Sequence, residues 1–192
     1  MSELKKIPVG ISARHVHVNR EDLDILYGPG YQLTLRKELS QPGQFAAEET
    51  VDLVTEKGTL KKVRILGPER KKTQIEISLT DSLKLGLKPP VRDSGDLKDS
   101  PGMTIVGPKG SIQLTEGTIA ACRHIHMTPA DAAAYGVKDK EIVKVRCEGP
   151  RGLIFDNVLI RVHDSFKLEM HVDTDESNAA MMNAQSAVEI LK

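Results

Sequence analysis

One short segment of the chain occurs twice. Residues 10–22 read GISARHVHVNRED and residues 119–131 read IAACRHIHMTPAD, so the two copies align at an offset of 109. The residues that recur are Arg14, His15, His17 and Asp22 in the first copy, and Arg123, His124, His126 and Asp131 in the second. Each copy has the pattern of a strand, an N-cap residue (Asn19 or Thr128) and a short helix, because an acidic residue three positions after the cap can bond back to it. Two copies of one unit predict two similar subdomains.

Short strands account for most of the remaining pattern. Runs with β-branched or alternating apolar residues predict strands at 60–66, 73–79, 141–147, 153–162 and 167–173. Helices are expected to start at Asn19, at Thr128 and near Asp175, and the Pro-, Gly- and Asp-rich stretch 88–102 is expected to form a loop. Many short strands with few helices favour a barrel or sandwich architecture.

Composition excludes several functional classes. The 192 residues are enough for one large or two small domains with a core that needs no disulfides. The 27 basic and 27 acidic residues cancel, and only 3% of residues are aromatic, so we expect no nucleic-acid partner. No signal peptide and no apolar window of membrane-spanning length is present, so we expect no membrane partner. Cys122 and Cys147 are then expected to be reduced thiols of a cytoplasmic protein.

The two His-x-His pairs predict metal binding. Side chains at i and i+2 of a strand point to the same face, so His15 and His17 project together, as do His124 and His126. Two imidazoles on one face form a clamp for zinc, which accepts nitrogen ligands. A polar strand surface is the alternative, but the duplication favours metal.

A catalytic zinc ion needs a third protein ligand at each pair. His171 and His163 are candidates, and a histidine near a strand end is also commonly a surface residue. Glu76 faces away from the flanking isoleucines, which fits either a solvated strand face or a carboxylate ligand. Cys122 has the strand parity of His124, but a small buried core residue is the simpler interpretation.

Basic residues concentrate between positions 57 and 72. The cluster comprises Lys57, Lys61, Lys62, Arg64, Arg70, Lys71 and Lys72, and Arg36 with Lys37 forms a smaller one. Charge runs are commonly solvated faces, but beside a zinc centre this one favours a small polyanionic ligand, since a guanidinium suits bidentate phosphate contacts. No GxxxxGK[ST] or GxGxxG motif supports a P-loop or Rossmann site.

The chain resembles a known family along nearly its whole length. The segments that carry the resemblance are IPVGISARHVHV, LTLRKELSQPGQFAAEETV, VRILGPERKKTQIEIS, VRDSGDL, GTIAACRHIHMTPADA and MHVDTDESNAA. Together they are similar to the phosphate propanoyltransferase family of propanediol utilisation, which is a phosphotransacylase family.

The resemblance implies a mainly β fold: two small β-barrel domains with short capping helices, related by the internal repeat. Residues 1–13 and 122–192 would form the first barrel, and residues 14–121 the second, with a small inserted hairpin around 28–48. It further implies a homodimer and a dinuclear zinc site, that is, two zinc ions per chain.

Site residues follow from the matching motifs. His15, His17 and Glu76 would hold one zinc ion, and His124, His126 and His171 the other. Arg70 resembles the catalytic, phosphate-binding arginine of the family. Ser12, Lys37, Arg64 and Asn178 fall in motifs that resemble the coenzyme A contacts.

The implied reaction interconverts acyl-CoA plus phosphate with acyl phosphate plus CoA, with a propanoyl or acetyl group. No Ser/His/Asp arrangement or activated cysteine is evident, so direct attack of phosphate is favoured over an acyl-enzyme. A zinc-dependent hydrolase and a non-catalytic, zinc-stabilised binding barrel are the alternatives. Family members packaged in bacterial microcompartments carry an N-terminal extension, whereas only six residues precede Ile7 here. Packaging through such an extension is therefore not expected, and a microcompartment reached by another route is the alternative to the cytoplasm.

Overall fold

The structure, a computed structural model, describes residues 6–191. The chain divides into two compact units, each of which is described by itself. Unit 1 contains residues up to Ser12, residues 40–42 and Cys122 onward; unit 2 contains Ala13–Leu39 and Gly43–Ala121.

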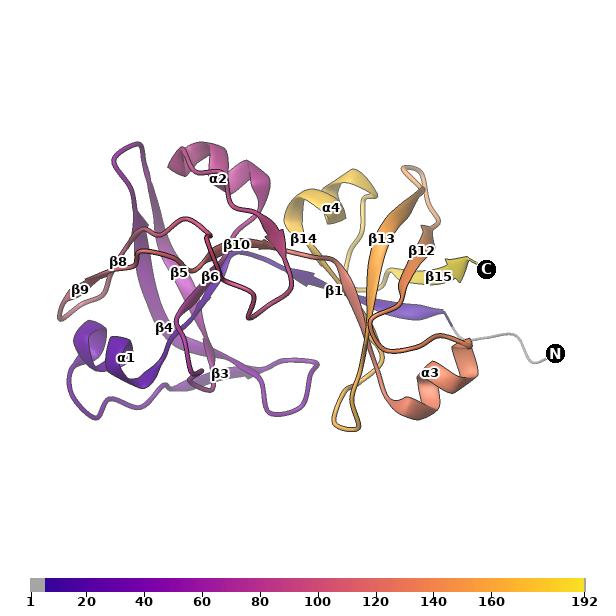
Figure 1. Cartoon of the computed structure of the whole chain (residues 1–192), viewed down its shortest axis with the longest axis horizontal. Coiled ribbons are helices and arrows are strands. Elements are labelled where there is room, and N and C mark those ends of the chain that lie inside the picture. Colours follow the sequence, from indigo (N-terminus) through magenta and orange to yellow (C-terminus); the bar gives the residue numbers. More distant parts are fainter. Residues whose placement is uncertain (1–5, 192) are drawn as a thin grey trace. The chain divides into compact units, whose positions relative to one another are not determined.

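Unit 1 is a closed six-stranded barrel (Figure 1). Its strands follow one another around the barrel in the order β1-β14-β11-β13-β12-β15. Their bounds are β1 (Ile7–Ser12), β11 (His124–Met127), β12 (Ile142–Cys147), β13 (Leu153–Val162), β14 (Glu169–Asp173) and β15 (Ala187–Leu191). Two short helices, α3 (Pro129–Tyr135) and α4 (Thr174–Ala179), follow β11 and β14.

Apolar side chains at every second strand position form the core of unit 1. In β12 every second residue is buried, as expected for a strand with one face on the core and one in solvent. Ile7, Ile125, Ile160 and Met170 are fully buried and belong to one apolar cluster.

Unit 2 is built on a nine-stranded sheet in the order β7-β10-β6-β2-β5-β4-β8-β9, with β3 paired to β4. The bounds of the first strands are β2 (His15–His17), β3 (Leu35–Glu38), β4 (Phe45–Val54), β5 (Thr59–Gly67) and β6 (Gln74–Glu76). The later ones are β7 (Val91–Arg92), β8 (Thr104–Val106), β9 (Ser111–Gln113) and β10 (Thr118–Ala121). The helices of this unit are α1 (Arg20–Tyr27) and α2 (Leu79–Leu85).

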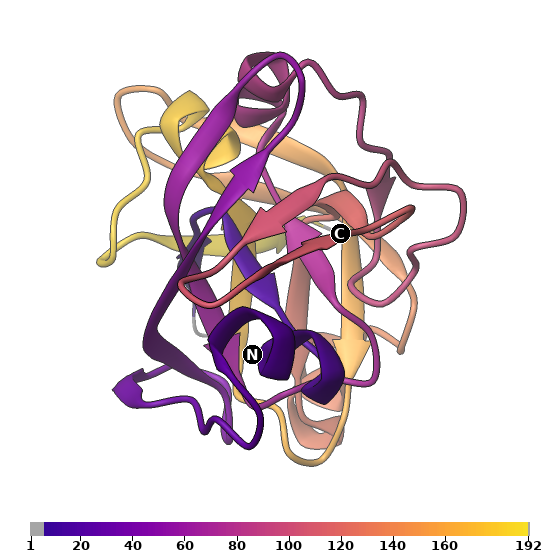
Figure 2. The same ribbon diagram turned by 90° about the vertical axis from the view of Figure 1, so that its left-hand side faces the viewer.

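The long antiparallel β4–β5 hairpin is the central element of unit 2 (Figure 2). Its turn is tied to the end of α2, because Thr55 Oγ1 donates a hydrogen bond to the Leu85 carbonyl at 2.7 Å. Leu53 and Ile65 on the hairpin are fully buried in the unit 2 core, together with Ile75 of β6 and Leu23 of α1.

Two of the points at which the chain passes from one unit to the other have the same local structure. β1 of unit 1 runs parallel to β14, with Gly10 opposite His171, and two residues later the chain enters β2 of unit 2. β10 of unit 2 runs parallel to β6, with Ile119 opposite Glu76, and two residues later the chain enters β11 of unit 1. Gly10 and Ile119 occupy equivalent positions of the sequence repeat. The repeat therefore covers the crossing strand as well as the His-x-His strand.

The mainly β class with short helices is confirmed. The expected strands match β5, β6, β12, β13 and β14, and the expected helix starts match α1, α3 and α4 within two residues. The helix α2 was not predicted, and the expected loop 88–102 contains only the short strand β7. Among the described residues, no helix is long and apolar enough to span a membrane.

Candidate metal centre

Four strand-to-helix corners share one local pattern. In each, a histidine or glutamate is followed by a buried apolar residue, then by the N-cap, and three residues later by an acidic residue whose backbone N–H bonds to the cap side chain. The corners are His17-Val18-Asn19 with Asp22, Glu76-Ile77-Ser78 with Asp81, His126-Met127-Thr128 with Asp131, and His171-Val172-Asp173 with Glu176. The apolar residue anchors the strand end in the core, so the residue before it points away from the core. All four leading residues belong to one of two groups of potential metal ligands.

The unit 2 group consists of His15, His17 and Glu76. β2 and β6 are antiparallel, and their register places His15 directly opposite Glu76. The Nε2 atoms of His15 and His17 lie 3.4 Å and 3.9 Å from the Glu76 carboxylate oxygens. The Nδ1 atoms face backbone carbonyls, of Ala13 at 2.8 Å and of Leu66 at 3.3 Å. Nδ1 of each ring therefore carries a proton, and both Nε2 atoms point toward the carboxylate.

A polar network holds Glu76 from behind. Its Oε1 accepts hydrogen bonds from Gln74 Nε2 at 2.5 Å and from Ser94 Oγ at 3.1 Å. Ser94 Oγ in turn accepts from Gln74 Nε2 and from Arg70 Nη1, each at 2.9 Å. The loop that carries Ser94 is fixed by the Gly95 N–H, which donates to Gln74 Oε1 at 2.7 Å. The Ser94 hydroxyl therefore connects Arg70 to Glu76 through two hydrogen bonds.

Electrostatics favour the metal-binding forms of Glu76 and His17, but not of His15. Burial alone would raise the pKa of Glu76, but His15 and His17 hold this pKa well below its ordinary value of 4.5. Burial lowers the pKa of His17 to about 3, with His15 and Arg70 adding to the effect. Burial acts in the same direction on His15, but the Glu76 carboxylate holds the His15 pKa above 6.5. Glu76 is thus charged and His17 neutral at pH 7, which are the forms that bind a metal ion.

The unit 1 group consists of His124, His126 and His171. β11 and β14 are antiparallel, and His124 lies opposite His171 just as His15 lies opposite Glu76. The three rings approach one another closely, with centroid separations of 4.6 Å, 4.9 Å and 5.2 Å. His124 Nδ1 faces the Cys122 carbonyl at 2.8 Å, which repeats the His15–Ala13 contact.

A carboxylate and an unsatisfied nitrogen mark the unit 1 group. Glu169 Oε2 accepts a hydrogen bond from His171 Nε2 at 2.6 Å and another from the Ser40 hydroxyl. Gly10 makes room for this carboxylate, since a Cβ there would lie 3.0 Å from it. His126 Nδ1 is buried without a hydrogen-bond partner in the described part of the chain, and burial lowers the pKa of His126 to about 2. A buried neutral imidazole with an unpaired nitrogen is costly unless an ion or a water satisfies it.

Both groups fit zinc. The ligand atoms within each group all lie within 4.8 Å of one another. Ligands about 2.0–2.1 Å from zinc at tetrahedral angles lie roughly 3.3 Å apart, so the separations in unit 2 need only small side-chain adjustments. Neutral imidazoles with carbonyl or carboxylate partners on the far nitrogen are the usual arrangement of metal-binding histidines. Three protein ligands leave a fourth position for substrate.

Comparison with known proteins identifies the family. A family model described as phosphate propanoyltransferase matches residues 8–183. The chain belongs to this family. A phosphate propanoyltransferase of Thermotoga maritima is 60% identical over 193 residues, which is 98% of this chain and 92% of that protein. One of Priestia megaterium is 56% identical over 92% of this chain and 82% of that protein, and one of Shewanella putrefaciens is 55% identical over 96% and 87%. Membership of the phosphate propanoyltransferase family confirms the predicted enzyme class, an acyltransferase.

The residues predicted from the sequence to contact coenzyme A are distributed over both units. Ser12 ends β1 and Asn178 is exposed on α4, both in unit 1. Lys37 is exposed on β3 of unit 2. Arg64 lies on β5 beside His15, where its Nη1 donates to the carbonyls of Ala47 and Glu48.

The alternative third ligands lie outside both groups in the described part of the chain. His163 is exposed, and its Nδ1 bonds to Ser165 Oγ at 2.8 Å. Cys122 contributes its carbonyl, rather than its thiol, to the orientation of His124.

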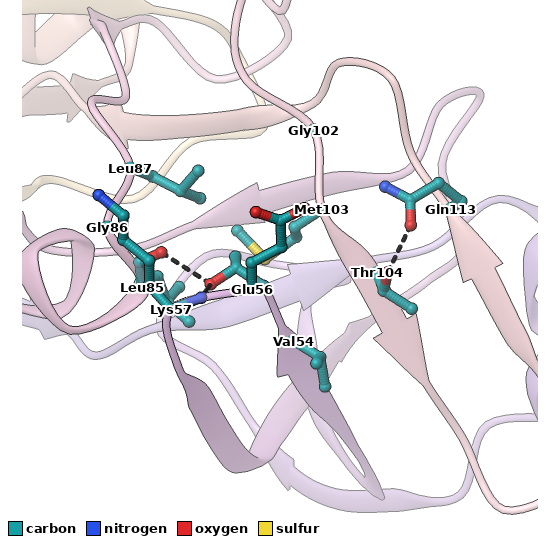
Figure 3. Close-up of a pocket in the computed structure, with 11 residues that line it drawn as sticks. Val54, Glu56, Lys57, Leu85, Gly86, Leu87, Gly102, Met103, Thr104 and Gln113 are labelled. Carbon is teal, nitrogen blue, oxygen red and sulfur yellow. Dashed lines mark hydrogen bonds between the residues drawn. The ribbon is translucent and has the colours of Figure 1, made fainter.

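Unit 2 also contains a surface pocket of about 360 Å³ (Figure 3). It is bordered by the β4–β5 turn, the end of α2 and the segment Gly102–Thr104. Thr104 and Gln113 bond across its rim. None of its lining residues belongs to either ligand group, so it is separate from the candidate site.

Proposed function

We propose that this acyltransferase interconverts acyl-CoA plus phosphate with acyl phosphate plus CoA, with a propanoyl or acetyl group, and that it uses two zinc ions, one in each ligand group. The observation that carries the proposal is the pair of matched three-ligand groups, each at the same strand register and each with a position left for substrate. The relatives named phosphate propanoyltransferase point to the same reaction.

His15, His17 and Glu76 would hold one zinc ion, and His124, His126 and His171 the other. Zinc held by these groups would supply Lewis acidity toward the thioester and would stabilise the departing CoA sulfur. An oxygen of hydrogen phosphate attacks the acyl carbonyl carbon, the C–O bond forms and the C–S bond breaks. Sulfur leaves with the electron pair, and the phosphate proton ends on the CoA thiol, so atoms and charge balance.

The protein's own groups position the nucleophile. Arg70 presents a guanidinium that binds phosphate oxygens in a bidentate manner, and Ser94 holds it beside Glu76. The negative charge of Glu76 directs phosphate away from its own carboxylate and toward Arg70. Ser12, Lys37, Arg64 and Asn178 are proposed to contact CoA, and the active species is proposed to be a homodimer in the cytoplasm.

Direct attack is favoured because a thiol nucleophile has no support. Burial raises the pKa of the Cys147 thiol, which keeps it protonated at neutral pH. Cys122 lies outside both ligand groups of the described chain.

The test is thiol release from propanoyl-CoA and acetyl-CoA by the zinc-loaded enzyme, with and without phosphate. Release is expected to require phosphate, and arsenate is expected to replace it, since the unstable acyl arsenate hydrolyses. Equal release in phosphate-free buffer would assign a zinc-dependent hydrolase instead. A zinc-loaded protein that releases no thiol would leave the binding-barrel alternative.

A further inference from the structure

The arginine that precedes each His-x-His pair forms an ion pair with a helix of its own unit. Arg14 Nη1 lies 2.6 Å from Asp81 Oδ1 in unit 2, and Arg123 Nη1 lies 2.6 Å from Glu176 Oε1 in unit 1. The arginines are equivalent in the sequence repeat, but their acidic partners lie outside it. The two contacts therefore recur in the fold although the partners lie outside the repeated segment.

The acidic partners occupy equivalent places. Asp81 is the third residue of α2 and lies five positions after Glu76; Glu176 is the third residue of α4 and lies five positions after His171. Each is also tied to its N-cap: Asp81 N–H donates to Ser78 Oγ at 3.2 Å, and Glu176 forms a capping box with Asp173.

Each ion pair completes a closed path of covalent bonds and contacts that includes two ligands of one metal group. Arg14 is covalently next to His15, His15 lies opposite Glu76 on the neighbouring strand, and the chain from Glu76 leads through the cap to Asp81. The same route runs from Arg123 through His124 and His171 to Glu176. The ion pair therefore fixes the start of the helix against the His-x-His strand, and with it the strand end that carries the third ligand.

We propose that Arg14 and Arg123 are positioning residues, each of which fixes the third ligand of its metal group through an ion pair to the helix that follows that ligand. The inference rests on the proposed two-zinc function.

The burial of the partners separates these contacts from ordinary surface ion pairs, which contribute little to stability. The Asp81 side chain is 11% exposed and the Glu176 side chain 19%. The arginines differ, since Arg14 is 45% exposed and Arg123 only 26%. Arg123 is further held by the Asp156 carbonyl at 2.7 Å and by the Phe155 ring, 5.4 Å from the guanidinium carbon. Loss of Arg123 is therefore expected to have the larger effect.

The experiment measures zinc affinity one group at a time. His126→Ala disables the unit 1 group, so that competition with a chromophoric chelator reports unit 2; His17→Ala does the reverse. In these backgrounds Arg14→Met and Arg123→Met are each expected to weaken zinc binding by about 10- to 100-fold, the usual effect of groups that orient metal ligands. Arg14→Lys and Arg123→Lys should restore part of the lost zinc affinity, because lysine keeps the positive charge but lacks the planar pair of donors of the guanidinium.

Arg20→Met is the matched control in unit 2. Arg20 is 39% exposed and pairs with Asp24 and Glu69, at 2.5 Å and 2.8 Å, but neither partner lies on α2, the helix that follows the third ligand of this unit. Its loss should leave zinc affinity unchanged. Thermal unfolding with and without zinc adds a second measure: Arg14→Met should reduce the rise in Tm that zinc produces, whereas Arg20→Met should lower Tm equally in both conditions.

The outcomes distinguish a failure of the proposed zinc function from a failure of the positioning role of the arginines. Wild-type protein that binds no zinc would overturn the proposed function and, with it, the positioning role of the two arginines. Wild-type protein that binds two zinc ions, with Arg14→Met and Arg123→Met of unchanged affinity, would overturn the positioning role alone. A double-mutant cycle between Arg14→Met and Asp81→Asn covers the case in which Arg14 acts by itself: additive losses in affinity would contradict the ion pair. Should Arg14→Met fail to fold, the Arg14→Lys comparison decides.

Discussion

Replacing Glu76 by glutamine tests the unit 2 group with the smallest change of shape. Oε1 of Glu76 accepts from Gln74 and Ser94, and Oε2 faces His15 Nε2 at 3.4 Å. An amide has one oxygen and one NH₂, so the NH₂ must face either the donors Gln74 and Ser94 or the position proposed for zinc. Glu76→Gln therefore removes the negative charge and misplaces a donor at once.

The size of the effect follows from burial. The Glu76 side chain is 12% exposed, so its charge interacts with a bound cation under weak screening by solvent. Removing one partner of a buried charge pair costs about 3–5 kcal/mol, which corresponds to roughly a 100- to 4000-fold change in an equilibrium constant. We expect Glu76→Gln to weaken zinc binding at the unit 2 group by this factor and to leave the unit 1 group at wild-type affinity.

The assay is chelator competition in the His126→Ala background, followed by zinc content per chain after dialysis of the single variant. Glu69→Gln is the control, because Glu69 is a carboxylate of the same unit that pairs with Arg20 and lies outside the ligand group. Thiol release from acyl-CoA should fall together with zinc content. Wild-type zinc affinity and turnover in Glu76→Gln would refute the assignment of this carboxylate as a ligand.

Three further changes probe other contacts. Arg70→Ala should lower turnover by about 100-fold, since charge-assisted hydrogen bonds contribute about 1.5–3 kcal/mol each and about 1.4 kcal/mol is tenfold in rate. Zinc content should stay at two ions, and Arg70→Lys should recover part of the rate. Arg92→Ala serves as the control, and normal saturation by phosphate in Arg70→Ala would contradict the role of Arg70 in phosphate binding. Glu169→Gln should weaken zinc binding at the unit 1 group by about 10- to 100-fold, because Glu169 orients His171; unchanged chelator competition in the His17→Ala background would count against this role. Burial by itself raises the pKa of Glu49, but hydrogen bonds from Thr34 and Tyr31 hold this pKa below 4.5. The ionised Glu49 carboxylate therefore stabilises the fold above pH 4.5, and this stabilisation is lost as the pH falls through the pKa of Glu49 in the folded protein. Glu49→Gln should accordingly lower Tm at pH 7 more than at pH 3, and equal losses at both values would contradict the linkage.

The sequence was sufficient to predict much of the local structure. The His-x-His strands, the caps at Asn19 and Thr128 and the strong strands depend on neighbours within a few residues, and the structure has them where they were expected. The roles of Glu76 and His171 depend on which strands are neighbours. The spacing alone left Glu76 between a solvated face and a ligand; the pairing of β2 with β6 places it opposite His15.

One signal in the sequence was overlooked. Glu76 and His171 each precede an apolar residue, a capping residue and, three positions later, an acid, as His17 and His126 do. This fourfold pattern also marks the start of α2 at Ser78, the helix that was not predicted. The Arg14–Asp81 and Arg123–Glu176 contacts have no comparable signature, because they join residues 67 and 53 positions apart.

The two chain crossings have a consequence for folding during synthesis. Residues 13–121 contain every strand of unit 2, so this unit has all its partners once β10 has left the ribosome. Unit 1 is in the opposite position, because β1 is the first strand made whereas its neighbours β14 and β15 are the last two. Ile7 and Val9, which are buried in the finished barrel, have to wait for nearly the entire chain. Ribosome-bound chains that have released β10 but not yet β14 should therefore carry a protease-resistant unit 2 attached to an unpaired, apolar N-terminal strand.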